Sequence, residues 1–388
     1  MLTALDGSEP DRLPATTHHL MPYFLETYLE GCSEGEFFDR FDLDPITWVW
    51  DFIPDESRGE YWSSESEGSE SEGSAAAGER WIVSDDWRIE ATAVPGTPEV
   101  IRYDIATPRE TLSMALRRGP QTDWVVERPI KRKEQIELLA RYAPHCLCDV
   151  AGINRQAKTM AEHGHGILRG AVPGFQIYGQ PGCWQDAAEL FGIEPLIMAA
   201  FDDPVWVHEF LAILRDRKLA SIASMEGARY DLIELGGGSA SSTVISPTLF
   251  TEFVAPYDSE LIAEAHRAGQ RVVYHTCGGM MPLLELIADM TPDAMETFTP
   301  PALGGDVDLN AAKARIGDRV CMIGGFDQFT HFQDCSPAET RRAVRDCFEA
   351  AGEGGGYILA PSDHFFDADI ALIEAFAEEA RGCRYDQL

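Results

Sequence analysis

From residue 166 to the C-terminus, short apolar runs alternate with segments of helical periodicity, which leaves few folds open to the chain. The runs are GILRGAV (166–172), YDLIELGGG (230–238), RVVYHTC (271–277), AMETFTP (294–300), RVCMIGG (319–325) and GYILAPS (356–362). The segments 204–225, 247–269 and 367–381 repeat apolar residues at three- and four-residue spacing, as a helix with one buried face does. Strands that alternate with helices predict a parallel sheet covered by helices.

Two helix starts in this region carry capping signals. Ser246 precedes Pro247, which places a capping hydroxyl before a proline at the first helical position. Ser336 and Glu339, in the segment SPAET, have the spacing of a capping box, in which each side chain bonds the other residue's backbone N–H. We therefore expect helices to begin directly after Ser246 and Ser336.

Two earlier stretches, near 47–53 and near 146–150, also have strand character and bring the total to eight. Eight strands predict an α/β fold of the (β/α)8 TIM barrel class with an N-terminal extension, and an open doubly wound sheet remains the alternative. Barrels of this kind often use a length such as the 388 residues here as one domain. We expect a single barrel domain over residues 1–388.

Residues 63–79, SSESEGSESEGSAAAGE, differ in composition from the rest of the chain. Their low-complexity Ser/Glu/Gly pattern has almost no apolar content, so burial cannot offset the entropy cost of ordering. The flanking segments 46–54 and 81–94 are aromatic and strand-like. We expect a disordered, acidic surface insertion that decorates a domain rather than separating two domains.

The chain is strongly acidic, with 65 Asp and Glu against 31 Lys and Arg and a formal net charge of −34. This charge repels phosphate backbones and anionic lipids, so we expect no nucleic-acid partner and no membrane association. Only five of the basic residues are lysines. An acidic, lysine-poor surface resembles those of halophile proteins, in which high ionic strength screens the self-repulsion.

No apolar run approaches the ~20 residues that span a bilayer, and the first residues, MLTALDGSEPDRLP, lack the basic and apolar regions of a signal peptide. We therefore expect a cytoplasmic protein. In that compartment the nine cysteines are expected to be free or metal-bound rather than paired.

The run at 271–277 ends with a histidine and a cysteine two positions apart. Side chains at i and i+2 of a strand point to the same side, so His275 and Cys277 converge if the extended backbone continues that far. In a barrel the carboxyl ends of the strands build the active site, and Glu296 and Asp363 lie at or just past other strand ends. Zinc takes three or four N, S or O ligands. The pattern indicates a metal site to which these four residues are candidate ligands.

Two further residues are candidates for proton transfer. His364 follows Asp363 after the last apolar run, and Glu234 ends an apolar run before a glycine-rich turn that permits close approach of a ligand. The alternative for each polar residue at a strand end is a hydrogen-bonded or solvated group without chemistry.

Two other groups of cysteines are expected to be structural. His145, Cys146 and Cys148 lie close enough in sequence to bind a metal together, but cysteines in an apolar strand are usually small core residues. Cys321 precedes Met322 and is expected in a strand interior.

Three ordered motifs resemble the uroporphyrinogen decarboxylase superfamily. They are a helix entry SP-x-x-F-x-E-F-x-x-P-Y (246–257), a strand end H-x-C-G (275–278) and a turn GG-x-D (324–327). The likeness extends over roughly residues 100 to 385. It implies a (β/α)8 barrel, in agreement with the strand count.

Within this superfamily the chain resembles the corrinoid-dependent methyltransferases more than true uroporphyrinogen decarboxylases. The decarboxylases carry an Arg-Gln-Ala-Gly-Arg segment near the N-terminus that holds substrate carboxylates, and nothing in the first 60 residues matches it. The methyltransferases carry His-x-Cys-Gly, which His275, Cys277 and Gly278 match, and a later cysteine, in place of which LAPSDHF has Asp363. Glu296 is similar in position to a zinc ligand of cobalamin-independent methionine synthase, a related barrel.

The resemblance implies a zinc-dependent methyltransferase that transfers a methyl group between a corrinoid (cobalamin) and a thiol or other heteroatom of a small-molecule substrate. It also implies that a separate corrinoid-carrier protein supplies the corrinoid, and that His275 and Cys277 bind Zn2+, with Glu296 and Asp363 as further candidate ligands. A metal-free decarboxylase, with Asp363 or Glu296 as acid or base, remains one alternative. A corrinoid- or tetrapyrrole-binding protein without enzymatic activity remains another.

Overall fold

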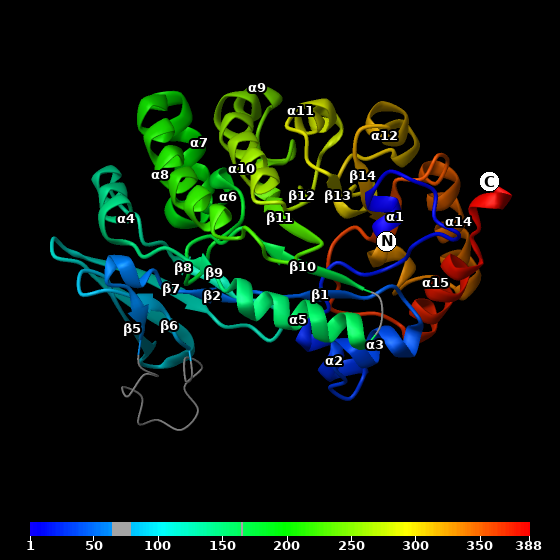
Figure 1. Ribbon diagram of the computed structural model, residues 1–388, viewed down its shortest axis with the longest axis horizontal. Coiled ribbons are helices and arrows are strands. Elements are labelled where there is room, and N and C mark those ends of the chain that lie inside the picture. The colour runs from blue at the N-terminus through cyan, green and yellow to red at the C-terminus, as the bar shows by residue number, and fades with distance from the viewer. Residues whose placement is uncertain (64–78, 164–165) are drawn as a thin grey trace.

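The computed structural model describes residues 1–63, 79–163 and 166–388. Seven parallel strands form a curled sheet in the order β1-β10-β11-β12-β13-β14-β15 (Figure 1). Their bounds are Ile46–Trp48 (β1), Ile167–Ala171 (β10), Leu232–Gly236 (β11), Val272–His275 (β12), Ala294–Thr297 (β13), Cys321–Phe326 (β14) and Tyr357–Pro361 (β15). The six apolar runs of the C-terminal half are strands β10 to β15, which confirms the strands predicted there.

Helices follow these strands and pack their apolar faces on the outer side of the sheet (Figure 1). They are α6 Cys183–Phe191, α7 Ile193–Asp202, α8 Pro204–Ala223, α9 Pro247–Leu249, α10 Ala255–Arg267, α11 Leu284–Asp289, α12 Leu309–Ile316, α13 Gln328–His331, α14 Pro337–Ala351 and α15 Ile370–Gly382. The earlier helices are α1 Leu2–Leu5, α2 Pro22–Tyr28, α3 Glu34–Phe41, α4 Ile136–Tyr142 and α5 Val150–His163. None of the helices in the described part of the chain has the length and apolar character that a bilayer crossing requires.

Both predicted helix starts are confirmed. The Ser246 side chain accepts a hydrogen bond from the backbone N–H of Leu249, and Pro247 is the first residue of α9. Ser336 and Glu339 form the expected capping box at the start of α14.

The barrel is confirmed, but its eighth position is filled by an unexpected segment. Ala15 forms a parallel bridge with Leu359 of β15, and its carbonyl accepts a hydrogen bond from the N–H of Asp44, two residues before β1. Residues 14–16 therefore lie between the first and last strands of the sheet. The sheet order rises from β10 to β15 without the reversal of a doubly wound sheet, which excludes that alternative.

The prediction of a barrel strand near 146–150 is wrong. Strand β9, Leu147–Cys148, pairs antiparallel with β2, Phe52–Ile53, outside the barrel. Residues 14–16 escaped prediction because a proline and a threonine interrupt their apolar pattern, and because two hydrogen bonds to Leu359 suffice to hold them.

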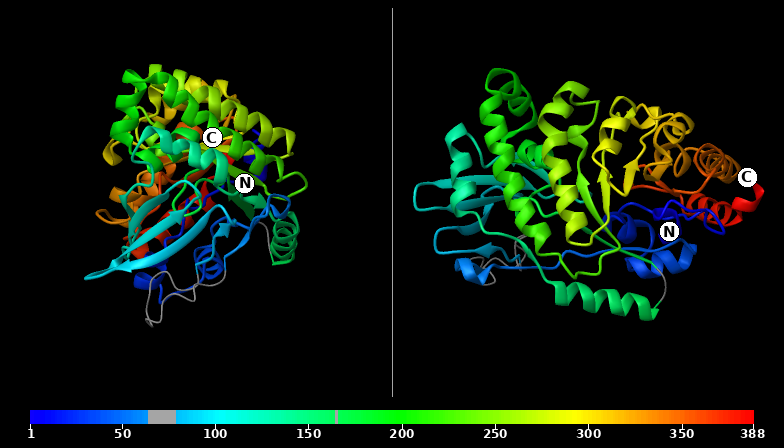
Figure 2. Two further views of the ribbon diagram at one scale, coloured as in Figure 1. Left: turned by 90° about the vertical axis from the view of Figure 1, so that its left-hand side faces the viewer. Right: turned by 45° about the horizontal axis from the view of Figure 1, so that its top comes forward.

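A separate antiparallel sheet lies beside the barrel at one end of the molecule (Figures 1 and 2). Its strands are β5 Arg88–Val94, β6 Thr97–Ala106, β7 Thr111–Arg117 and β8 Trp124–Glu127. Tyr103 and Leu116 belong to a buried cluster that packs on Phe175 and Ile177, in the segment after β10. A short hairpin of β3 (Tyr61–Trp62) and β4 (Ile82–Val83) flanks the expected insertion at 63–79, which lies, apart from its end residues, outside the described residues.

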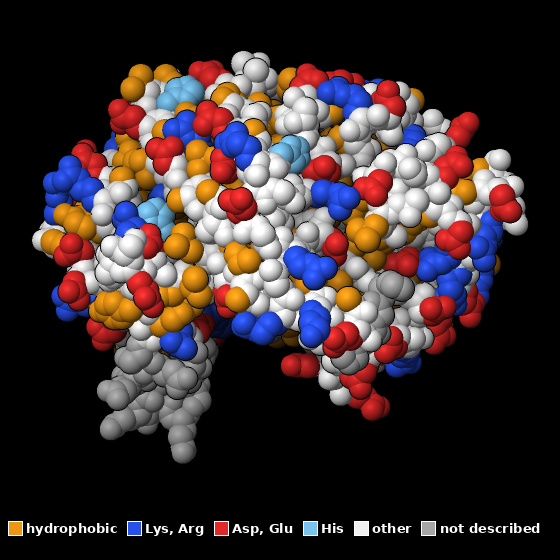
Figure 3. Space-filling view, in the orientation of Figure 1, with side chains coloured by type: hydrophobic (Ala, Val, Ile, Leu, Met, Phe, Trp, Pro, Cys, Tyr) orange, Lys and Arg blue, Asp and Glu red, His pale blue; other side chains and the backbone are white. Residues whose placement is uncertain are grey.

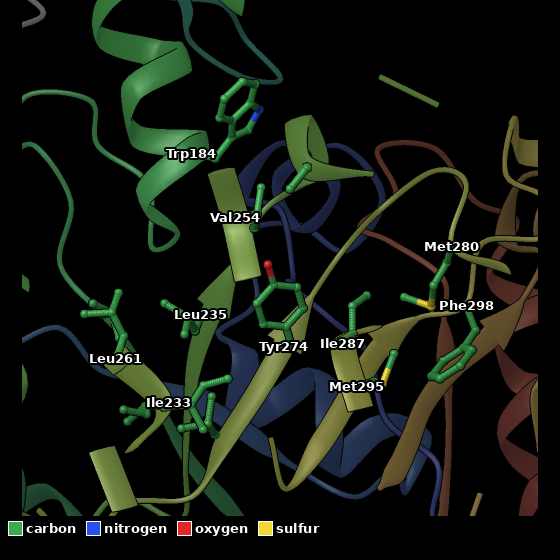
Figure 4. Close-up of a cluster of buried hydrophobic side chains, with 14 of the residues drawn as sticks. Trp184, Ile233, Leu235, Val254, Leu261, Tyr274, Met280, Ile287, Met295 and Phe298 are labelled. Carbon is green, nitrogen blue, oxygen red and sulfur yellow. The ribbon is translucent and has the colours of Figure 1, made fainter. Parts of the chain in front are cut away.

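Alternation along the strands divides the core into two layers. Ile233, Leu235 and Tyr274 point outward and pack against the helices (Figure 4). Leu232 and Val273, one position away, belong to a second cluster inside the barrel. Because side chains of a strand alternate between its faces, the residue two positions after each inner apolar residue also points into the barrel.

Candidate active site

Four polar side chains form a layer inside the barrel, above the apolar interior. Ile167, Leu232 and Ala294 belong to the inner apolar cluster, as does Val273. Each of these four residues is followed, two positions later on the same strand, by a polar residue. On β10, β11, β12 and β13 in turn these are Arg169, Glu234, His275 and Glu296. Strand alternation alone therefore brings these side chains to one level near the carboxyl ends of neighbouring strands.

Arg169 occupies the centre of this layer and is completely buried. It donates from Nη1 to Oε2 of Glu296 at 2.9 Å and from Nη2 to Oε2 of Glu234 at 2.6 Å, and Nη2 also contacts Glu296. Its guanidinium carbon lies 4.3 Å from the ring centroid of Trp48. A buried guanidinium needs such partners because desolvation of an unpaired charge is costly.

Glu296 is the acceptor shared by this network. Oε1 of Glu296 lies 2.9 Å from Nδ1 of His275, and Oε2 lies 3.7 Å from Nδ1 of His18. Burial opposes ionisation, but the charges of Arg169 and His18 and the hydrogen bond from His275 outweigh it and hold the pKa of Glu296 well below its usual range. Glu296 is therefore a carboxylate whose charge the surrounding side chains neutralise.

His275 lies between two candidate clusters of metal-binding atoms. His275, Cys277 and Asp363 each offer one atom within 4.8 Å of the others, although Cys277 lies beyond the end of β12. A second group at the same spacing joins His275 to Glu296, Glu234 and His18. Burial disfavours protonation of His275, but hydrogen bonds with Cys277 and Glu296 outweigh it and raise its pKa well above the ordinary value.

The position of the Cys277 thiol depends on the glycine-rich turn after β11. A Cβ atom built on Gly238 would lie 2.4 Å from the sulfur of Cys277, so only glycine leaves room for the thiol. The glycines that follow Glu234 in the sequence thus have a packing role at the site.

Asp363 and His364 form a pair at the end of the last strand. Nδ1 of His364 lies 2.8 Å from Oδ1 of Asp363, and the backbone N–H of His364 donates to the same oxygen. Burial favours the neutral acid, but His364 and the more distant His18 and His275 lower the pKa of Asp363 below its ordinary range. The His364 side chain is 37% exposed, so it connects the carboxylate to solvent.

The structure thus places His275, Cys277 and Asp363 together, and it places Glu296 and Glu234 with Arg169 in a second group that also includes His275. Arg169 and His18 were not expected at the site. Arg169 had a signal in the sequence, because a charged residue inside the apolar run GILRGAV must be buried with partners. His18 had none, because it follows the segment that fills the eighth barrel position.

The cysteines expected to be structural lie elsewhere. Cys321 is 2% exposed in β14, and Cys148 is buried where β9 meets β2. His145 lies beside Glu60, with 3.7 Å between Nδ1 and Oε1, and neither His145 nor Cys146 belongs to a candidate metal cluster among the described residues.

A cavity of about 730 Å3 opens beside the polar layer. Glu234 and His19 line it, together with Trp48 and Trp50 of the first strand region and Phe175 of the segment after β10. His19 is neutral at ordinary pH, because burial and the charges of His18 and Arg169 lower its pKa to about 2. Glu234 therefore belongs both to the cavity wall and to the buried network.

The donor set fits a zinc ion on chemical grounds. Imidazole nitrogen, thiolate sulfur and carboxylate oxygen are the ligand types that zinc takes in proteins, and three protein ligands are typical of a catalytic zinc site. His275, Cys277 and Asp363 supply one of each. Glu296 also lies near His275, but Arg169 and Nδ1 of His275 already engage both of its oxygens.

Comparison with known proteins is consistent with this picture of the chain. The family model of uroporphyrinogen decarboxylase (URO-D) matches residues 99–382. The chain is 26% identical over 276 residues to uroporphyrinogen decarboxylase of Psychromonas ingrahamii and 25% identical over 273 residues to that of Hydrogenovibrio crunogenus; each match covers 67% of this chain and 71% of the relative. A methyltransferase from Methanosarcina mazei superposes with a TM-score of 0.60 at 14% identity, over 98% of this chain and 96% of that one, and has the same fold.

Proposed function

The chain belongs to the uroporphyrinogen decarboxylase family, and from its site we propose that it is a zinc-dependent methyltransferase. It would transfer a methyl group between a corrinoid and a thiol or other heteroatom of a small substrate. The observation that carries this proposal is the convergence of a nitrogen, a sulfur and an oxygen donor, from His275, Cys277 and Asp363, inside one barrel mouth. A decarboxylase that works by acid–base chemistry alone has no need of a thiol in such a cluster.

We assign zinc binding to these three residues and a positioning role to Glu296. A metal-binding histidine generally donates its other ring N–H to a carboxylate, which fixes the tautomer and the ring orientation. Glu296 accepts from Nδ1 of His275 at 2.9 Å, so Nε2, the nitrogen left for the contact with Cys277, is the one that would bind the metal. Arg169 holds Glu296 in place through both carboxylate oxygens.

Zinc, when bound, supplies a Lewis acid that lowers the pKa of a substrate thiol or polarises another heteroatom. The remaining chemistry falls to the protein's own side chains. His364, half-exposed beside Asp363, exchanges protons between the site and solvent. Glu234, at the wall of the cavity, orients the substrate or accepts a proton from it.

The corrinoid is expected to come from a separate carrier protein, because the sequence contains no recognisable corrinoid-binding motif. The strongly acidic chain favours action on a small molecule rather than on nucleic acid.

A metal-free decarboxylase is the second candidate, favoured by the names of the two relatives. The cavity weighs against a polycarboxylate substrate. Arg80 is the one Lys or Arg that lines the cavity among the described residues, and Arg169 is already engaged by two glutamates. The chain also lacks the arginine-containing N-terminal segment of true decarboxylases, and has His18 and His19 after its first barrel segment.

Elemental analysis tests the proposal. Untagged protein purified in high salt without chelators is expected to contain about one zinc per chain, in line with one three-ligand site. The H275A/C277A double variant is expected to lose it. The matched control is H145A/C146A, which removes the same two residue types outside both metal clusters and is expected to keep zinc.

Methyl transfer is then measured with methylcobalamin as donor and a thiol as acceptor. Activity that requires zinc and falls at least tenfold in C277A supports the proposal. Zinc-free protein, or wild-type rates in C277A at full zinc occupancy, contradicts it and favours the decarboxylase.

A further inference from the structure

We propose that the cavity beside the polar layer binds a planar aromatic molecule that carries a negative charge, as the substrate of the same site. Six residues that line this cavity of about 730 Å3 are called the pocket below: Trp48, Trp50, Trp62, Phe175, Tyr178 and Arg80. The inference rests on the proposed function only in calling this ligand the substrate. Its binding can be tested independently.

A cluster of near-parallel aromatic rings, those of His19, Trp48 and Trp50, lines the pocket. The rings of His19 and Trp48 lie with centroids 4.0 Å apart at an interplanar angle of 16°, those of Trp48 and Trp50 at 5.2 Å and 24°, and those of His19 and Trp50 at 6.2 Å and 15°, so the three near-parallel rings are mutual neighbours. Trp50 is the most exposed residue of this cluster, at 53%. A large, half-exposed indole can stack with another flat ring, and aromatic pairs prefer an offset parallel arrangement of this kind.

A second wall of the pocket is held rigidly. Phe175 and Tyr178 lie on the segment after β10, and the N–H of Phe175 donates to the buried carboxylate of Asp186 at 3.2 Å. The buried Lys218 lies 3.0 Å from Asp186 and donates to the carbonyl oxygens of Pro173 and Gln180, one near each end of the segment. A preformed wall lowers the entropy cost of holding a rigid ligand.

The charges of the pocket select against a cation. Indole rings attract cations, but two of the three tryptophans already hold a guanidinium: Arg169 lies 4.3 Å from the ring of Trp48, and Arg80 lies 5.2 Å from that of Trp62. The carboxylate of Glu234, which would otherwise attract a cation, is paired with Arg169. The pocket therefore presents little uncompensated negative charge.

Arg80 supplies the contact for an anion. Its side chain is exposed, and no carboxylate of the described residues lies within ion-pair distance of it. A guanidinium fixed above an indole presents its N–H groups in the plane that matches a carboxylate. A ring stacked on Trp50 and an acidic group at Arg80 would satisfy both features of the pocket.

Three related probes separate the contributions of shape and charge. They are 2-naphthoate, a planar anion; 2-naphthylmethylammonium, a planar cation; and decahydro-2-naphthoate, an anion of similar size that is not planar. Isothermal titration calorimetry in high salt is expected to show binding of 2-naphthoate at least tenfold tighter than of either other probe, because each lacks one of the two contacts. Equal or tighter binding of the cation or of the saturated anion would overturn the inference.

The variants W50L and R80Q locate the site, and W124L is the matched control. Trp124 is 63% exposed on β8 and does not line the cavity. W50L and R80Q are each expected to weaken 2-naphthoate binding roughly tenfold, whereas W124L leaves it unchanged. Unchanged binding in both W50L and R80Q would also overturn the inference.

Zinc content of the same preparations separates this inference from the proposed function. Zinc at the site without 2-naphthoate binding contradicts the substrate class alone. Binding of 2-naphthoate that depends on Trp50, in protein without zinc, contradicts the zinc-dependent methyltransferase and leaves the aromatic pocket supported.

Discussion

His275 and Glu296 face each other across neighbouring strands, with Nδ1 of the imidazole 2.9 Å from Oε1 of the carboxylate. Because the two residues are paired in the register of β12 and β13, the backbone itself sets this contact. The same carboxylate accepts from Arg169 and lies near His18. Glu296 therefore links the candidate metal ligand His275 to the buried guanidinium of Arg169.

The variant E296Q distinguishes a positioning carboxylate from a direct ligand. If Glu296 orients His275, the amide oxygen still accepts the Nδ1 proton but carries no charge, so zinc affinity falls by no more than about 10- to 100-fold, the range found when such a partner is mutated. Competition with a chromophoric chelator measures this change, with H145A as the control. Loss of zinc as complete as in H275A would instead identify Glu296 as a ligand.

Replacing Arg169 is expected to be strongly destabilising. The variant R169M leaves Glu234 and Glu296 without their cation, and breaking a buried ion pair in this way costs about 3–5 kcal/mol of unfolding free energy. Denaturant unfolding in high salt measures it. The triple variant R169M/E234Q/E296Q removes the charges together and is expected to recover part of the loss; no recovery would mean that packing against Trp48, rather than charge, dominates.

The repeating half of the barrel could be predicted from sequence because each strand there is a contiguous apolar run followed by an amphipathic helix. The helix starts at Ser246 and Ser336 were equally local, since a cap depends on residues three positions apart. The segment that fills the eighth barrel position could not be predicted from the nearby sequence. Residues 14–16 have no strand pattern of their own, and they pair with Leu359 only because the rest of the barrel brings that strand to them.

The candidate site, too, could be predicted from the sequence only in part. His275, Cys277 and Asp363 follow strands that the sequence marks, and the rule that barrel strands end at the active site brought them together in the prediction. The sequence could not show that Arg169 engages Glu234 and Glu296, because that contact depends on which inner residues share a level. The aromatic cluster of His19, Trp48 and Trp50 depends on where the chain runs after residues 14–16, a segment whose place in the barrel could not be predicted.

The capping box of α14 offers a direct measure of local stability. In S336A the backbone N–H of Glu339 loses its acceptor, and a cost of about 1 kcal/mol in unfolding free energy is expected. S336D keeps an acceptor at this position and is expected to remain near the wild type. The capping box at Ser33 of α3 serves as an internal comparison, because S33A removes the same contacts from a shorter helix. A cost below about 0.3 kcal/mol in S336A would mean that solvent replaces the cap.

Asp258 is expected to make the protein more stable at mildly acidic pH. It is buried, and burial raises its pKa to about 6 although Tyr274 and the N–H of Cys183 donate to it. Since the folded state holds this proton more tightly than the unfolded state, the contribution is complete below the unfolded pKa of 3.8 and is lost as pH rises through about 6.

The difference in unfolding free energy between the wild type and D258N isolates this group from the other carboxylates. Between pH 4 and pH 7 it is expected to shift in favour of D258N by up to about 3 kcal/mol, the equivalent of a shift of about two pKa units. Denaturant titrations at several pH values measure the difference. A difference that does not change with pH would show that Asp258 has the same pKa in both states.

Net charge predicts how the protein responds to salt. With a formal charge of −34 and acidic side chains spread over the visible surface (Figure 3), mutual repulsion opposes the compact state. Raising the ionic strength from 0.1 M to 1 M shortens the screening length from about 10 Å to about 3 Å, so the unfolding midpoint should rise with NaCl. Sodium sulfate at equal ionic strength is the control that separates charge screening from anion-specific salting-out. At low ionic strength the two salts should raise the midpoint equally, because screening depends on ionic strength alone. A midpoint that is indifferent to NaCl would mean that the 31 basic residues already neutralise their acidic neighbours locally, as Arg315 and Glu285 do on the surface.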